Sequence, residues 1–311
     1  MSFQIIIQQM GVICLLVAIG ILLEKKGTVD SLTSRKISAI VVDVCNPALI
    51  MASILDGGIT AGHRELAVAA VLGAVFYSVL IVTGLILPRL LKVKTDERRF
   101  YNLMCVYTNT GFLGIPVARA VLPADSILYV IVINVFYSLL FYTHGQVILG
   151  GTEKGGKKNV LRGIFSPGTI MAVLSLFVFA FDIKLPPILG NTVSYVGNAT
   201  VFLSMVLLGV NISRSKLSSS LKDLRIWAFV LLRMILFPAA VVIIMNALHI
   251  DKAAIFAMCL MAAVPVGNMP MIQAEKQGMD TRVLSSAIAV TTAVSMASIT
   301  LLIALCAAYL G

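Results

Sequence analysis

The chain has 311 residues and a formal net charge of +10, with 59% apolar residues and only 12% charged residues. Its mean hydropathy is +1.00. So little polar surface excludes a water-soluble globular domain and predicts an all-α integral membrane protein that crosses the bilayer many times. Attraction of basic loops to anionic lipid accounts for the positive charge, so we expect no nucleic-acid partner.

A helix needs about 20 mainly apolar residues to cross the hydrocarbon core of a bilayer. Ten stretches of this kind, separated by short polar connections, are present in the sequence. They lie at 5–23, 37–55, 66–88, 100–121, 126–149, 167–183, 192–211, 226–248, 252–273 and 283–309. The first stretch runs into Glu24-Lys25-Lys26 rather than into a small-residue cleavage site, so we expect it to be a mature helix.

The basic residues predict how the chain lies in the membrane. Of the 24 Lys and Arg residues, 19 fall in the odd-numbered connections between the predicted spans. Because Lys and Arg collect in loops on the cytoplasmic side, both termini are expected outside the cytoplasm of a multi-pass protein of the cell membrane.

No chemical motif in the sequence indicates catalysis. The chain lacks a His-Glu-x-x-His pair, a Gly-x-Ser-x-Gly elbow and a phosphate-binding Gly-rich loop. All five cysteines fall inside predicted spans, without the spacing of a metal site or a disulfide framework. We therefore expect neither an enzyme nor a bound cofactor or metal, and any transport would run on a gradient rather than on ATP.

Two apolar stretches in the middle of the fourth and ninth spans are broken by Gly, Pro and Asn. They begin at Met104-Cys105 and Met258-Cys259, which lie 154 positions apart, and the same shift superposes the other spans of the two halves. Five helices then repeat, and because five is odd, the second copy enters the membrane from the opposite side. The predicted organisation is a first repeat at 1–149, a cytoplasmic linker at 150–166 and a second, inverted repeat at 167–311.

The two breaks are the candidate substrate site. Proline removes a helical hydrogen bond and glycine lets the chain unwind, so each broken span should form two half-helices that cross near the midplane. Helix N-termini at the crossing suit a carboxylate, and the free carbonyls of the opposite ends suit a cation or a donor group. The candidate residues are Asn109, Thr110, Gly111, Gly114 and Pro116 in the first break, and Pro265, Gly267, Asn268, Met269, Pro270 and Gln273 in the second.

Three ionisable residues inside or near the spans are candidates for coupling or charge pairing, because such residues are costly in a membrane. One reading pairs Arg233 with Glu275, and another lets Arg233 meet the substrate carboxylate. Glu275 or Asp43 is a candidate proton-coupling carboxylate, although both could instead reach the cytoplasmic interface.

The stretch Thr108-Asn109-Thr110-Gly111-Phe112-Leu113-Gly114-Ile115-Pro116 resembles the Ser-Asn-Thr-Gly-Phe-Leu-Gly-Ile-Pro motif of the auxin efflux carrier family. Asn46-Pro47-Ala48-Leu49-Ile50 resembles its second-helix element, which adds Asn46 to the candidate site, and Pro265-Val266-Gly267-Asn268 resembles its ninth-helix signature.

This resemblance implies a ten-helix fold like that of the bile acid symporters. Helices 1, 2, 6 and 7 would form a scaffold and helices 3, 4, 5, 8, 9 and 10 a transport domain, moving in an elevator-like cycle. It also implies a small organic anion as substrate and a homodimer through the scaffold. Coupling to protons or to sodium, as in the bile acid symporters, stays open, as does a sensor without net transport.

Overall fold

The computed structural model describes residues 3–55, 62–149, 165, 167–214 and 223–310. Within these ranges every regular element is a helix. Six helices are long and apolar enough to cross a membrane: Ser31–Leu55, His63–Leu90, Ser126–Ile148, Pro187–Arg214, Leu224–Ala247 and Arg282–Leu310. The prediction of an all-α multi-pass membrane protein is confirmed at this level, whereas the arrangement as two inverted five-helix repeats stays a prediction.

Several helices run on through a short π-helical segment (η). In the first half the elements are α1 (Phe3–Lys25), α2 (Ser31–Ile40), η1 (Val41–Cys45), α3 (Asn46–Leu55), α4 (His63–Leu90), α5 (Arg98–Val106), η2 (Thr110–Gly114), α6 (Ile115–Val121), α7 (Ser126–Leu140), η3 (Phe141–Gly145) and α8 (Gln146–Ile148). In the second half they are α10 (Pro167–Ala180), α11 (Pro187–Arg214), α13 (Leu224–Phe229), η4 (Val230–Leu236), α14 (Phe237–Ala247), α15 (Lys252–Ala263), α16 (Met269–Lys276) and α17 (Arg282–Leu310). The predicted linker at 150–166 lies almost wholly outside the described residues.

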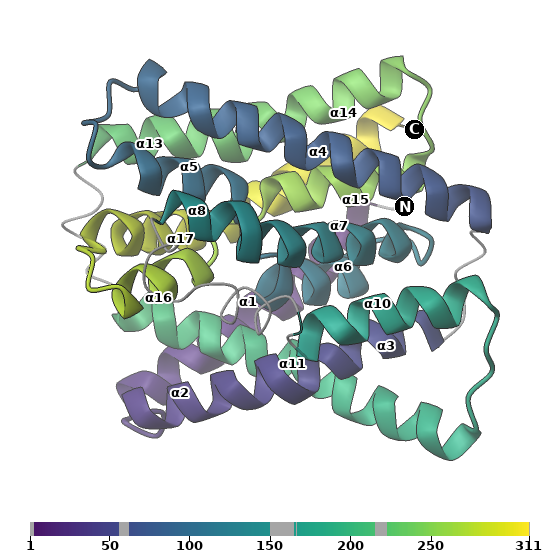
Figure 1. Cartoon of the computed structure of the whole chain (residues 1–311). Coiled ribbons are helices and arrows are strands. Elements are labelled where there is room, and N and C mark those ends of the chain that lie inside the picture. The colour runs from purple at the N-terminus through teal and green to yellow at the C-terminus, as the bar shows by residue number, and fades with distance from the viewer. Residues whose placement is uncertain (1–2, 56–61, 150–164, 166, 215–222, 311) are drawn as a thin grey trace.

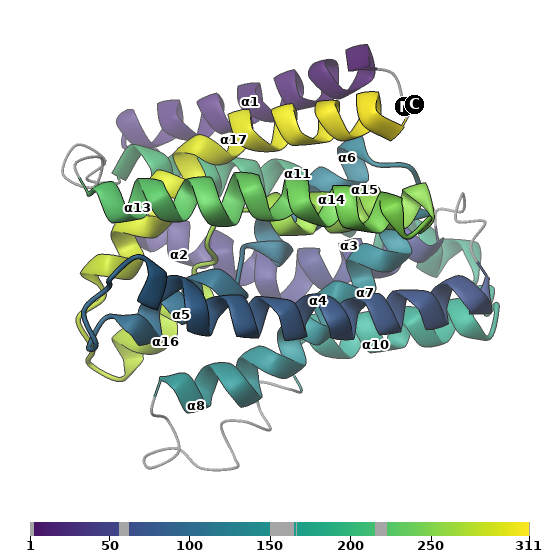
Figure 2. The same ribbon diagram turned by 90° about the horizontal axis from the view of Figure 1, so that it is seen from above.

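The helices form layers (Figure 1). Helices α4, α13 and α14 lie along one side, α2, α3, α10 and α11 lie along the opposite side, and α5, α7 and α15 lie between them. Helix α1 runs beside α17, and the two ends of the chain lie at the same end of the bundle (Figure 2). The loops from α4 to α5 and from α16 to α17 lie at the opposite end in both views.

Helices α5 and α15 of the middle layer are buried on all sides. Residues Ala254–Ala263 of α15 and Phe100–Val106 of α5 are all buried. A helix that is apolar around its whole circumference belongs inside the protein. The first half of each broken span therefore lies at the centre of the molecule, whereas α16 in the second half of the ninth span is partly exposed.

Bare glycines let α1 and α11 approach closely. A Cβ atom on Gly20 would lie 2.1 Å from the carbonyl oxygen of Val206, and one on Gly209 would lie 2.1 Å from that of Val17. Small residues at a crossing are the usual means by which membrane helices pack backbone to backbone. Helix α11 also packs on α3, and α3 on α10. The predicted division into scaffold and transport domain stays a prediction.

Candidate functional site

Both predicted breaks are present, and their backbones bond to each other. The N–H of Asn109 donates to the carbonyl oxygen of Pro265 at 2.8 Å, and the N–H of Gly267 donates to that of Tyr107 at 3.1 Å. Thr108 and Val266 thereby form an antiparallel bridge. Unwound backbone at bilayer depth needs partners inside the protein, and here each break supplies them to the other.

The residue types at the crossing fit this geometry. A Cβ atom at Gly267 would lie 2.9 Å from the carbonyl oxygen of Thr108 and 3.0 Å from that of Tyr107, so a side chain would push the two breaks apart. Pro270 lies in the first turn of α16, where a helix does not use its backbone N–H, whereas Pro116 follows η2 in a helix that already begins at Thr110. In the second break, Gly267 thus allows the close approach and Pro270 fits the start of the next helix.

A cavity of about 30 Å³ opens beside the crossing. Its walls carry Asn109, Phe112, Asn268, Ile288 and Thr292 on one side, with Ser38, Ser204, Leu207, Leu208 and Asn211 from α2 and α11 on the other. The volume is about that of one water molecule. All ten lining residues are uncharged. The cavity thus joins the two asparagines of the breaks in one neutral, polar site that is too small here for an organic molecule.

Two further predicted residues lie next to the first break. The side-chain nitrogen of Asn46 lies 3.2 Å from the position that a Cβ atom on Gly111 would take, while its side-chain oxygen is buried and has no hydrogen-bond partner among the described residues. The hydroxyl of Thr110 donates to the side-chain oxygen of Asn134 on α7 at 3.2 Å. Asn46, Thr110 and Gly111 therefore gather at the crossing with Asn109.

The other predicted residues take different positions. A Cβ atom on Gly114 would lie 3.1 Å from the sulfur of Met261, so this glycine lets the fourth span pack on the ninth. Met269 begins α16, and the half-buried Gln273 lies one turn further along it, outside the lining of the cavity. Asp43 lies in η1 and is exposed. Glu275 belongs to α16, but its side chain is outside the described part of the structure.

Arg233 is 1% exposed and lies at the C-terminal ends of α5 and α15. Its Nε donates to the carbonyl oxygen of Cys105 at 2.8 Å, and its Nη1 donates to that of Ala262 at 2.5 Å. The predicted pair with Glu275 stays a prediction.

Tyr107 ties the crossing to α7. Its hydroxyl donates to the carbonyl oxygen of Leu140 at 2.9 Å and lies 2.8 Å from Nδ1 of His144. Its ring packs edge-on against Phe141, with 5.1 Å between the centroids. The carbonyl of Tyr107 is the acceptor for Gly267, so these contacts help to fix the first break in place.

Several polar side chains of the site are not among the residues predicted from the sequence. These are the cavity residues Ser38, Ser204, Asn211 and Thr292, together with Asn134 and with Thr291, whose hydroxyl accepts the backbone N–H of Val266 at 3.3 Å. Polar residues inside apolar spans often indicate function in membrane proteins. Asn134 and Asn211 are such residues, so they could have been predicted from the sequence. Serine and threonine carry little such signal, because their hydroxyls can bond to a carbonyl of their own helix, as that of Thr291 does to Ala287 at 2.6 Å.

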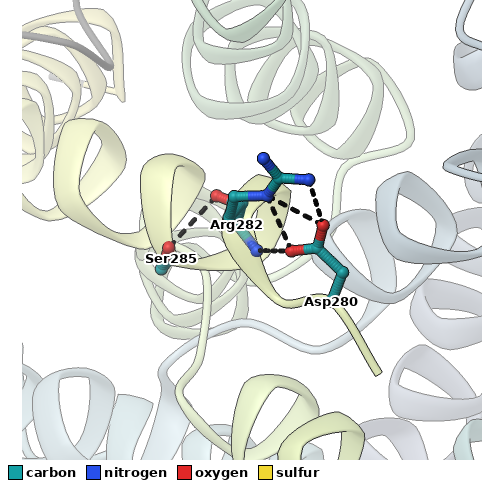
Figure 3. Close-up of polar contacts among 3 residues, drawn as sticks. All are labelled: Asp280, Arg282 and Ser285. Atoms are coloured by element: carbon teal, nitrogen blue, oxygen red, sulfur yellow. Dashed lines mark hydrogen bonds and ion pairs between the residues drawn. The ribbon is translucent and has the colours of Figure 1, made fainter. Parts of the chain in front are cut away.

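A charged pair, Asp280 and Arg282, lies at the start of α17 (Figure 3), and neither residue lines the cavity. Nε of Arg282 donates to both carboxylate oxygens of Asp280, at 3.0 and 2.8 Å. These hydrogen bonds hold the pKa of the Asp280 carboxyl below its usual value. Both side chains are more than half exposed, so the pair caps a helix rather than forming a site.

Comparison with known proteins identifies the family. The family described as membrane transport protein matches residues 5–303. An uncharacterized transporter of Methanocaldococcus jannaschii is 24% identical, over 93% of this chain and 95% of the relative. An uncharacterized transporter of Methanothermobacter thermautotrophicus is 22% identical, over 93% of this chain and 94% of the relative. The chain belongs to the membrane transport protein family, which is the auxin efflux carrier family that its fourth-span motif resembles.

Proposed function

We propose that this protein is a secondary active transporter that carries a small organic anion, in particular a carboxylate, across the cell membrane. The family and the two relatives support transport, and the site supports the substrate class. The proposal is for a carrier without catalysis or cofactor.

One observation carries this proposal: the crossed breaks place Asn109 and Asn268 in the wall of one cavity. Two helical segments restart beside it, at Thr110 and at Met269. Helix N-termini carry partial positive charge and free N–H groups, and asparagine amides add donors. A neutral lining with two such ends favours one negative charge on the ligand.

The position of the cavity supports an elevator-like cycle. One wall belongs to the crossing and to α17, and the other belongs to α2 and α11. These elements correspond to the two domains that the sequence resemblance implies. Sliding one wall past the other would carry a bound anion across the membrane and would widen a cavity that holds about 30 Å³ in this conformation.

We also propose both termini on the outer side and a homodimer through the scaffold helices. The shared position of the two termini supports a common side (Figure 2), and the basic loop from α4 to α5 at the opposite end of the bundle favours the outer side. Large apolar side chains stay exposed on α10 and α11, among them Phe177, Ile188 and Tyr195, and such a face fits lipid or a second copy. Cysteine labelling from either side of intact cells tests the orientation, and cross-linking in the membrane tests the dimer.

The decisive experiment is uptake into proteoliposomes of labelled mono- and dicarboxylates, under a pH gradient, a sodium gradient, or neither. We expect uptake that is saturable and that Asn109→Ala and Asn268→Ala abolish while leaving the protein folded. Asn198→Ala, at an exposed position of α11, is the matched control and should behave as wild type. Wild-type flux in both site variants would refute the site. A strict sodium requirement would indicate a sodium symporter, and binding without flux would indicate a sensor.

A further inference from the structure

The C-terminal ends of α5 and α15 meet beside Arg233, deep in the molecule. The last four carbonyls of a helix have no partner within it unless the chain turns back on itself. Here Leu103 and Leu260 accept the N–H groups of Tyr107 and Val264, at 2.8 and 3.0 Å.

The carbonyls of Cys105 and Ala262 belong to the same two helix ends, and Arg233 binds one from each. The two donor atoms are Nε and Nη1 of a single guanidinium. Because the group is planar and rigid, two hydrogen bonds from it fix the distance and angle between the acceptors. One side chain therefore holds the C-terminal ends of α5 and α15 together, and the segments that follow these two helices form the crossing.

The charges at this point balance. A helix C-terminus carries about half a negative charge, so two such ends carry about one. The guanidinium supplies one positive charge. Arg233 forms no ion pair with any carboxylate that the structure describes, and the side chain of Glu275 lies outside that part. Among the described residues, its negative partners are the two helix ends.

The surroundings of Arg233 are those of a fixed internal group. Its guanidinium lies 4.9 Å from the centre of the Phe237 ring, and the side chain is 1% exposed. A buried cation is costly unless partners compensate it. The two carbonyls and the aromatic face do so for Nε and Nη1, while Nη2 is buried without a hydrogen-bond partner among the described residues. The residue does not line the cavity, so it is not placed to touch a substrate in this conformation.

We propose that Arg233 is a positioning residue that acts as a built-in cation: it joins and neutralises the C-terminal ends of α5 and α15, where a carrier without it would need a bound metal cation. The inference deepens the proposed function and rests on it for its transport readout. It implies that sodium does not bind at these helix ends, because the guanidinium already occupies the carbonyls of Cys105 and Ala262.

The first test needs no substrate. Purified wild-type protein in detergent is melted in sodium chloride and in choline chloride of equal ionic strength, and the same midpoint is expected in both. Arg233→Ala should melt lower, and added guanidinium chloride below denaturing concentrations should raise its midpoint while leaving that of wild type unchanged. Arg89→Ala, which removes an exposed arginine that bonds within its own helix, is the control for loss of charge.

The second test separates charge from size. Arg233→Lys keeps the cation, and Arg233→Met replaces it with a neutral chain of similar length. We expect Lys to retain part of the thermal midpoint and of the carboxylate uptake, Met to lose both, and guanidinium to restore uptake by Arg233→Ala. Wild-type behaviour of Arg233→Met, in both thermal midpoint and uptake, would overturn the proposal. Because the melting results do not depend on the substrate, they stand even if no carboxylate is transported.

Discussion

Gly267 lies where the two breaks come closest, and its replacement by alanine tests whether their contact holds the site together. The added Cβ would lie 2.9 Å from the carbonyl oxygen of Thr108 and 3.0 Å from that of Tyr107, and both are backbone atoms. Relief requires the breaks to separate, which stretches the 3.1 Å hydrogen bond from Gly267 to Tyr107. Overpacking costs about 1–3 kcal/mol and an unsatisfied buried polar group about 1–3 kcal/mol, so the expected loss of stability is about 2–6 kcal/mol.

The assay compares thermal midpoints in detergent with initial uptake in proteoliposomes. Gly190→Ala is the matched control, because a Cβ atom at Gly190 of α11 would meet no atom within 4 Å. Alanine favours a helix over glycine by about 1 kcal/mol, so the control should melt at or slightly above the wild-type temperature. Gly267→Ala should melt lower and lose uptake. Equal behaviour of the two variants would refute the role of close backbone contact at the crossing.

Three further predictions concern other parts of the molecule. Gly209→Leu should prevent α1 from packing on α11, since even a Cβ would lie 2.1 Å from the carbonyl oxygen of Val17, and the loss of folded protein is measured by size-exclusion chromatography. Ser204→Ala removes a buried hydroxyl that has no hydrogen-bond partner among the described residues but lines the cavity, so the thermal midpoint should hold or rise while uptake falls. Asp280→Asn should change uptake little. Because folding lowers the pKa of Asp280, its small stabilising effect is present at neutral pH and is lost as the pH falls through that lowered value, so melting curves of variant and wild type should converge in acid.

The local chemistry of the breaks explains why the sequence predicts them well. Proline and glycine act on the chain within a turn, so the positions of Gly111, Gly267 and Pro270 indicate where a helix stops and restarts without knowledge of the packing. The predicted span at 226–248 likewise matches α13, η4 and α14, which run over Leu224–Ala247. Apolar length is also a local property, and it sets the limits of a membrane helix.

The partners across the molecule could not be read in the same way. The pairing of Arg233 with Glu275 or with the substrate stays a prediction. The acceptors that the structure describes are the carbonyls of Cys105 and Ala262, which carry no sequence signal because every residue has a carbonyl. The far wall of the cavity depends on which faces of α2 and α11 turn inward. Ser204 lies in a largely apolar stretch, so nothing in the local pattern separates its side of the helix from the lipid side.

The neutral lining of the cavity makes sense for a carrier that must also return empty. A fixed, unpaired lysine or arginine in the site would bind an anion tightly, but it would have to cross the membrane uncompensated after release, at a cost of about 3 kcal/mol or more. Amides such as Asn109 and Asn268, together with partial charges at helix ends, attract an anion without leaving a full charge behind. The full charge of Arg233, next to the crossing, is instead bound by two helix ends, and the side chain is 1% exposed. In the proposed cycle, the full charge of Arg233 stabilises the fold, while the amides and helix ends of the cavity bind the anion. Because the cavity wall itself carries no full charge, the site can cross the membrane both with and without its substrate.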